Sequence, residues 1–353
     1  EQVFGPVGEA LRDVCEPPAT AVHVVVPDEA QDLLFLPFEL ARFEDGARFT
    51  DAGVRFIYQL EGAAHGKEKV PPEETLRVLA VFSLPVRQNP LNLRRERHGL
   101  QQSIRELCQT RGVAVELRVL QYGATRESLE DALQEGEGWD VVHASGHGRE
   151  GAILLEDDRG GTDEIDAGDL EKLLRPAKSR LKLLVLDACH TGASHAAARA
   201  QVGLEDPPVR QEGAEGEAVP ETEETVLPSL GQELAQQLDC AALAMRYPVG
   251  DAFATDLALS LYDKLLKQRQ PLPQALHLAM DDAMNAETRP GPMSRVTPIL
   301  IGPRGAALQL RPPDAGPTKF VPPHVGLRIG FPPQPDRFVG RLQPMLRASQ
   351  ALA

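Results

Sequence analysis

Short apolar runs alternate with amphipathic stretches along most of the chain from about residue 77. The apolar runs that predict strands are 76–82, 113–120, 140–145, 181–187, 241–246 and 296–301. The amphipathic stretches that predict helices are 95–110, 125–135, 229–238, 252–267 and 273–285. Because strands that alternate with helices build parallel crossovers, this pattern predicts an α/β fold with a mostly parallel central sheet.

The pattern also divides the chain into three parts. Residues 1–75 are less regular, with candidate strands at 21–26 and 33–36, and we expect an N-terminal extension packed on the sheet. Residues 76–305 form the main domain, interrupted at 204–225 by a segment rich in Glu, Pro and Gly that predicts a mobile acidic loop. Residues 306–353 are rich in proline, which is typical of a semi-rigid linker.

Composition narrows the classes of function. The chain has 353 residues, 42% of them apolar, which is enough for at least one large core, and no apolar run reaches the length of a membrane span. Four widely spaced cysteines argue against a disulfide framework, so we expect a reducing cytoplasm and no membrane partner. A net charge of −15, without a basic cluster, argues against direct nucleic-acid binding.

Two segments carry the candidate chemistry, and each follows a predicted strand. They are His143-Ala144-Ser145-Gly146-His147-Gly148 and Leu186-Asp187-Ala188-Cys189-His190-Thr191-Gly192. In open α/β sheets, functional groups gather at the carboxyl ends of the strands. If the two strands are neighbours, the His147 imidazole can take the proton of the Cys189 thiol. The backbone N–H groups of Gly148 and Cys189 are then the natural donors to an oxyanion.

Each of these residues also has an alternative interpretation. A cysteine after an apolar strand is more often an inert core thiol, and His143 fits a buried core histidine. His190 has either a structural role or one in shaping the pocket. Zinc ligation by His143, His147 and His190 with Cys189 is disfavoured because the run before His147 is strand-like, not helical, and the glutamate of an H-E-x-x-H motif is absent. With no G-x-S-x-G elbow either, we expect a cysteine nucleophile without metal or cofactor.

These segments resemble the CHAT family of clan CD peptidases, relatives of caspases, metacaspases and separase, over residues 76–305. Further segments that resemble the family are Leu36-Pro37-Phe38-Glu39-Leu40, Gly151-Ala152-Ile153-Leu154-Leu155-Glu156 with Asp169-Leu170, and Met245-Arg246-Tyr247-Pro248-Val249 with Phe253, Tyr262 and Leu265-Leu266. The resemblance implies a caspase-like α/β/α sandwich, a dyad of His147 and Cys189, and endopeptidase cleavage through a thioester.

The resemblance also suggests a specificity and a form of activation. Asp187 stands two residues before Cys189, where metacaspases place an acidic pocket residue, so a basic residue before the scissile bond is expected. The alternative is that Asp187 caps the following turn. In caspase relatives the loop after the cysteine strand is cut on activation, and Arg199 and Arg210 are the candidate self-cleavage positions; an ordinary solvated loop is the alternative.

The segment Phe338-Val339-Gly340-Arg341 resembles the start of signalling ATPase modules, so the linker is expected to lead into one, with a disordered tail as the alternative. The family implies a protease controlled by sensor or ATPase modules in a prokaryotic defence or cell-death response. Its partner would be a protein substrate, of which a gasdermin-like pore former is one class. The alternatives are a catalytically silent interaction domain and a metal-dependent hydrolase, which the spacing of the candidate ligands supports poorly.

Overall fold

The computed structural model describes residues 20–27, 30, 33–34, 36–62, 69, 74–86, 88–136, 138–149, 151–188, 229–286 and 290–314. All of them belong to the compact unit that spans Glu1–Pro323. Among the described helices, none is long and apolar enough to cross a membrane.

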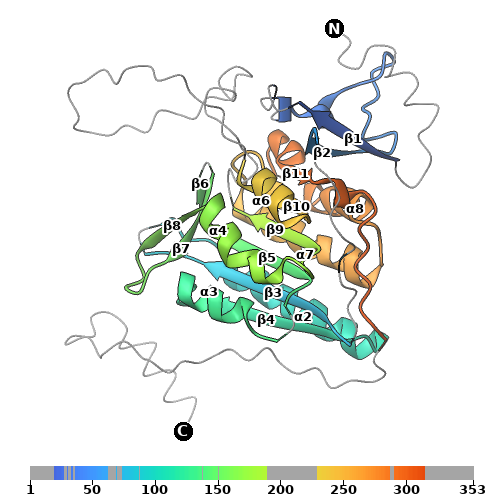
Figure 1. Cartoon of the computed structure of the whole chain (residues 1–353). Coiled ribbons are helices and arrows are strands. Elements are labelled where there is room, and N and C mark those ends of the chain that lie inside the picture. Colours follow the sequence, from blue (N-terminus) through green and yellow to red (C-terminus); the bar gives the residue numbers. More distant parts are fainter. Residues whose placement is uncertain are drawn as a thin grey trace, which may run out of the picture. The chain divides into compact units, whose positions relative to one another are not determined.

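Eight of the described strands form the central sheet, in the order β1-β2-β11-β10-β9-β5-β3-β4 (Figure 1). These strands are β1 (Thr20–Val26), β2 (Val54–Leu60), β3 (Leu76–Ser83), β4 (Val115–Gln121), β5 (Val141–Gly146), β9 (Leu183–Asp187), β10 (Ala241–Met245) and β11 (Pro298–Ile301). A smaller antiparallel sheet contains β6 (Gly148–Arg149), β7 (Ala152–Glu156) and β8 (Thr162–Asp166).

Strand direction confirms the predicted fold class. Adjacent strands in the run β4-β3-β5-β9-β10 are parallel to one another, whereas β11 is antiparallel to β10. β2 pairs with β11 and β1 with β2, both in parallel, so the N-terminal strands extend the same sheet. The result is a mostly parallel sheet whose functional edge lies at the carboxyl ends of its five parallel strands.

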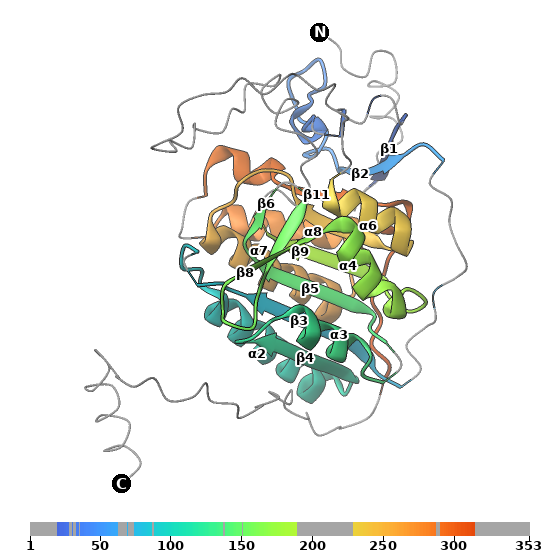
Figure 2. The same cartoon turned by 60° about the vertical axis from the view of Figure 1, so that its left-hand side comes forward.

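Helices cover both faces of this sheet and complete three layers (Figures 1 and 2). On one face lie α2 (Leu93–Arg111), α7 (Asp251–Tyr262), continued by a π-helical turn η4 (Asp263–Lys267), and α8 (Leu272–Met284). On the other lie α3 (Arg126–Leu133), α4 (Ala167–Leu174) and α6 (Leu230–Leu238). Because both faces are covered, β3 and β9 are buried at every position, as their continuous apolar runs require.

Local signals set the ends of two predicted helices. The Thr125 side chain accepts from the Ser128 N–H, and the Ser128 hydroxyl accepts from the Thr125 N–H, which caps the start of α3. Gly112 ends α2 in the left-handed conformation, at φ 63°, where a residue without Cβ is favoured. Both predictions are confirmed.

One predicted strand is wrong, and several elements were not predicted. Leu33 and Leu34 lie in a 3-10 turn, closed by the Leu36 N–H bond to the Leu33 carbonyl, instead of a strand over 33–36. The sequence also gave no clear signal for β2 or for the small sheet. The strands β6 to β8 are short, and their pairing depends on Gly151, at φ 71° in the turn between β6 and β7.

The N-terminal segment is tied to the central sheet by a buried charge. Arg246, which follows β10, is fully buried, and its Nη1 donates to Glu39 Oε2 at 3.3 Å. The Tyr58 hydroxyl of β2 donates to Glu39 Oε1 at 2.9 Å, and the Arg246 guanidinium lies 4.8 Å from the centre of the Tyr58 ring. This network joins η2 (Phe38–Leu40), β2 and the end of β10.

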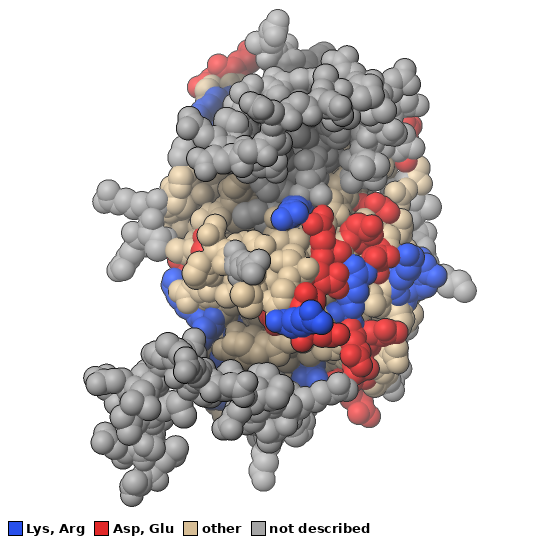
Figure 3. Space-filling model, turned by 90° about the vertical axis from the view of Figure 1, so that its left-hand side faces the viewer, with Lys and Arg blue, Asp and Glu red and all other residues tan. Residues whose placement is uncertain are grey.

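Charges on the side formed by β6 to β8 are mixed in sign (Figure 3). Arg126 pairs there with Asp163 and Asp169, and Arg149 pairs with Glu164. The described residues on this side therefore form no extended basic surface of the kind that binds a nucleic-acid backbone.

At the amino end of the parallel strands, Asp140 anchors the sheet. Its carboxylate is fully buried and accepts from the Arg77 N–H, from Nε and Nη2 of Arg180, and from Lys182 Nζ at 2.6 Å. These bonds connect the starts of β3, β5 and β9. Since both cations are themselves largely buried, the loss of the anion would remove a close charge partner from each of them.

We therefore expect Asp140→Asn to lower the free energy of unfolding by about 3–5 kcal/mol, measured by urea denaturation. The matched control is Asp163→Asn, which removes a partly exposed ion pair with Arg126 and should cost about 1 kcal/mol or less. Equal losses in the two variants would contradict an anchoring role for Asp140.

Candidate active site

The two segments singled out by the sequence end on neighbouring strands. β5 pairs in parallel with β9 from Val141 with Leu183 to Ser145 with Asp187. His147 follows β5 by one residue, and Cys189 follows Asp187 by two, but Cys189 lies outside the described residues. The structure thus brings the histidine together with the strand that leads to the cysteine.

The His147 ring is oriented by the loop between β3 and α2. Its Nε2 lies 2.7 Å from the backbone carbonyl of Asn89, and a carbonyl oxygen can only accept. Nε2 therefore carries the proton, and in the neutral ring Nδ1 holds the lone pair. Because Nε2 already carries a proton, Nδ1 is the ring nitrogen that can accept one, and the side chain is half-buried.

Backbone geometry around His147 depends on the two adjacent glycines. A Cβ at Gly146 would lie 2.6 Å from the Ser83 carbonyl oxygen, so this position of β5 has no room for a side chain. Gly148 faces Ile153, and the neighbouring Leu154 N–H donates to the His147 carbonyl. In an antiparallel ladder, hydrogen-bonded and non-hydrogen-bonded pairs alternate, so Gly148 and Ile153 exchange no hydrogen bonds.

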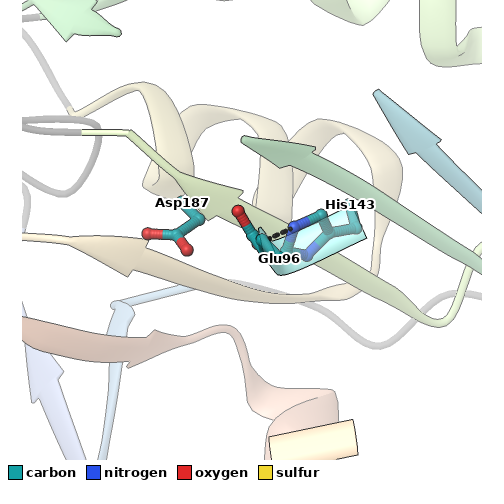
Figure 4. A group of neighbouring side chains, drawn as sticks. All are labelled: Glu96, His143 and Asp187. Carbon is teal, nitrogen blue, oxygen red and sulfur yellow. Dashed lines mark hydrogen bonds and ion pairs between the residues drawn. The ribbon is translucent and has the colours of Figure 1, made fainter. Parts of the chain in front are cut away.

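A buried polar cluster lies beside these strand ends, formed by Glu96, His143 and Asp187 (Figure 4). Their exposed fractions are 3%, 0% and 5%. His143 Nε2 lies 2.8 Å from Glu96 Oε1, and the Ser145 hydroxyl donates to Glu96 Oε2 at 2.6 Å. Each of the three residues offers a ligand atom within 4.8 Å of the others. His143 is thus a buried histidine with a partner, as expected from its place on the strand.

The negative charge of the Asp187 carboxylate is only partly compensated in this cluster. Its Oδ1 is buried and has no hydrogen-bond partner among the residues that the structure describes. Burial, followed by the charge of Glu96, raises the pKa of Asp187 to about 7, against the opposing effect of His143. A carboxyl whose pKa is raised on folding destabilises the folded state as pH rises from about 4 to about 7, so Asp187 costs stability at neutral pH.

The pKa of the His143 imidazole is also raised. Complete burial acts to lower its pKa, but the hydrogen bond and charge of Glu96, aided by Asp187, outweigh burial and raise it. Tyr262, packed against the His143 ring at 5.7 Å between centroids, also has a raised pKa because of burial and the two carboxylates. The charges acting on Asp187 are those of Glu96, His143 and Asp251.

The two cysteines that the structure describes are poor nucleophiles. Burial raises the pKa of Cys240 to about 12 and also raises that of Cys108. Since the thiolate is the reactive form, neither thiol is suited to attack a carbonyl. Cys189 remains the cysteine candidate that the motif indicates.

Other predicted positions fall outside the described ranges: His190, the segment 204–225, Arg199 and Arg210. Of the zinc set considered from the sequence, Cys189 and His190 lie outside the described residues, whereas His147 contacts the Asn89 carbonyl and His143 contacts Glu96.

Sequence reasoning missed Glu96 and Ser145. Glu96 occupies the apolar stripe of α2 formed with Leu93, Leu100 and Ile104, and all four residues are buried. A single acid in a core-facing stripe was the signal that could have identified it. Ser145 lies opposite Asp187 in the register, which only the pairing of β5 with β9 reveals.

Comparison with a solved structure of TM-score 0.50 agrees with this fold. The complex of the pro- and mature domains of RgpB from Porphyromonas gingivalis is 12% identical over 86% of this chain and 70% of that chain, with a TM-score of 0.50. The Arg-specific cysteine proteinase gingipain R (RgpB) is 12% identical over 86% of this chain and 68% of that chain, with a TM-score of 0.49. Among curated proteins, none matches the sequence.

The sequence profile of the CHAT domain covers residues 2–314, which includes the N-terminal strands and every strand and helix of the sheet described above. The match therefore extends beyond the segment 76–305 in which the resemblance was first seen. This chain belongs to the CHAT domain family and has a caspase-like, cysteine-peptidase-like fold.

Proposed function

We propose that this chain is a cysteine endopeptidase in which His147 and Cys189 form the catalytic dyad. The observation that carries the proposal is the parallel pairing of β5 with β9, together with the His147 ring that donates Nε2–H to the Asn89 carbonyl. This orientation leaves Nδ1 as the proton acceptor at the edge of the sheet where the cysteine strand ends.

The reaction follows from these groups. His147 Nδ1 takes the Cys189 proton, and the thiolate attacks the scissile carbonyl, whose oxygen becomes an oxyanion. The N–H groups of Gly148 and Cys189 donate to that oxygen, and the unpaired ladder position of Gly148 supports this role. His147 then protonates the leaving amine, which leaves a thioester. A water molecule, deprotonated by His147, hydrolyses the thioester and restores the thiol.

The preferred residue before the scissile bond is basic in this proposal. Asp187 is buried with an unpaired oxygen, Glu96 adds a second carboxylate, and the Ser145 hydroxyl lies beside both strands. A guanidinium or ammonium group would supply the positive charge that the described residues around Asp187 lack, apart from the His143 imidazole. If Asp187 only capped the following turn, the buried carboxylate of Glu96 beside it would have no explanation.

We further propose, from the family resemblance, that attached sensor or ATPase modules regulate the peptidase in a prokaryotic defence or cell-death response. The substrate would be a protein in the cytoplasm, with a gasdermin-like pore former as one candidate class. The C-terminal Phe338-Val339-Gly340-Arg341 supports the presence of a downstream module.

Removal of either member of the dyad is expected to abolish peptide cleavage. Cys189→Ala should leave no activity, and His147→Ala should reduce kcat/KM by about 10²–10⁴-fold because the general base is lost. Fluorogenic peptides with Arg, Lys, Leu or Asp before the reporter measure both. The matched controls are Cys108→Ala and His23→Gln, which alter a buried thiol and a histidine of β1. Activity that survives Cys189→Ala would falsify the dyad, and absence of cleavage by the unaltered protein would favour the silent alternative.

Substitution of Asp187 tests the pocket separately from the dyad. Asp187→Asn keeps the size of the side chain but removes its charge, so kcat/KM for Arg substrates should fall by about 10–100-fold, whereas cleavage after Leu changes little. Asp158→Asn, on an exposed turn, is the control. Equal cleavage after Arg and Asp by the unaltered protein would eliminate a basic preference.

Self-processing is expected at Arg199 or Arg210, because a basic preference would apply to the chain's own segment after the cysteine strand. Intact mass spectrometry of the active protein should show products that end at one of these arginines, and Cys189→Ala should remain whole. Identical intact masses in the two proteins would exclude self-processing.

A further inference from the structure

The cluster of Glu96, His143 and Asp187 also has the composition of a metal site. One imidazole and two carboxylates come from three elements, α2, β5 and β9, so packing of the helix on the sheet holds them together (Figure 4). This is a donor set that Zn²⁺ binds in proteins. All three side chains are at least nine-tenths buried.

Two polar atoms of the cluster lack a hydrogen-bond partner among the described residues. Asp187 Oδ1 and His143 Nδ1 are both buried without a hydrogen-bond partner in the described part of the chain. Within the same residues, His143 is the only ion-pair partner of Glu96, and neither Lys nor Arg is among the charges that act on Asp187. Two buried carboxylates thus face one imidazole, and a divalent cation would compensate them.

We propose that Glu96, His143 and Asp187 bind one Zn²⁺ ion, and that the bound ion closes the pocket to basic side chains. The second half rests on the proposed function, because it takes Asp187 as the pocket residue; the first half does not. Zn²⁺ fits better than Ca²⁺ or Mg²⁺ because one ligand is an imidazole and only three are available, whereas Ca²⁺ needs roughly six to eight oxygens.

Only a small rearrangement is needed for coordination. Zinc bonds of about 2.0–2.2 Å place tetrahedral ligands roughly 3.4 Å apart. His143 Nε2 and Glu96 Oε1 are already 2.8 Å apart, and the ion would replace the proton between them. Asp187, at the end of β9, offers a carboxylate oxygen within 4.8 Å of the ligand atoms of Glu96 and His143, and this carboxylate would turn toward them. The Ser145 bond to Glu96 Oε2 would hold the ligand carboxylate from its other oxygen.

The test measures zinc binding directly, in a Cys189→Ala background so that the thiol does not compete for the metal. Isothermal titration with ZnCl₂ should give one ion per chain. His143→Gln and Asp187→Asn should each weaken binding by at least about tenfold. His277→Gln is the matched control, because His277 and Asp281 form the other His–carboxylate pair of the described residues, and it should leave the affinity unchanged.

Several outcomes would overturn the site. They are absence of binding up to about 100 μM ZnCl₂, binding that survives both ligand variants, and tighter binding of CaCl₂ or MgCl₂. Since His143→Gln alters the core, circular dichroism checks its fold. Asp187→Asn gives an independent measure: ZnCl₂ should raise the melting temperature of the Cys189→Ala protein but not that of the double variant.

The pocket half of the proposal has its own measurement. With active protein, ZnCl₂ should raise KM for Arg peptides without an equal loss of kcat, because ion and substrate share Asp187. If ZnCl₂ lowers kcat and leaves KM unchanged, the proposal that the bound ion closes the pocket is overturned. If the chain cleaves no peptide, the titration still decides the metal site, so the two failures are distinguishable.

Discussion

The parallel pairing of β5 with β9 is the contact on which the candidate site depends. It is set by a register of five residue pairs, and a slip of one residue would turn every side chain on a strand to the opposite face. With this register, His143, Ser145 and Asp187 lie on the face covered by α2, and His147 lies just beyond the strand end. Without it, His147 and the strand that leads to Cys189 would not end at the same edge of the sheet, and the buried cluster would not form.

Two buried aspartates at opposite ends of these strands differ in how far their charge is compensated. Asp140, at the amino end, accepts from Arg180, Lys182 and a backbone N–H, so its charge is compensated. Asp187, at the carboxyl end, retains an unpaired oxygen and a pKa of about 7. A buried charge left without a partner costs stability, and such a cost is typical of a site that binds a cation.

The N-terminal strands contribute to the same sheet although they precede its first crossover. β2 joins β11 through Tyr58 and Ile301, and Glu39 receives hydrogen bonds from both Tyr58 and Arg246. Arg246 follows β10, the neighbour of the strand that leads to Cys189. The segment around Glu39 is therefore part of the structure that supports the strand ends, which agrees with a family match that begins at residue 2.

Much of this architecture could be predicted from the sequence, because burial on both faces requires continuous apolar strands such as β3 and β9, and caps such as Thr125 act locally. The candidate dyad could also be predicted, since its residues stand beside such strands. The role of Glu96 could not, because it lies 47 residues from His143 in sequence and meets it only when α2 packs on the sheet. The sequence determined the strands of the parallel core and the residues that follow them, but not β2 or the small sheet; the tertiary structure decided which acids share a buried space, because that depends on contacts between distant segments.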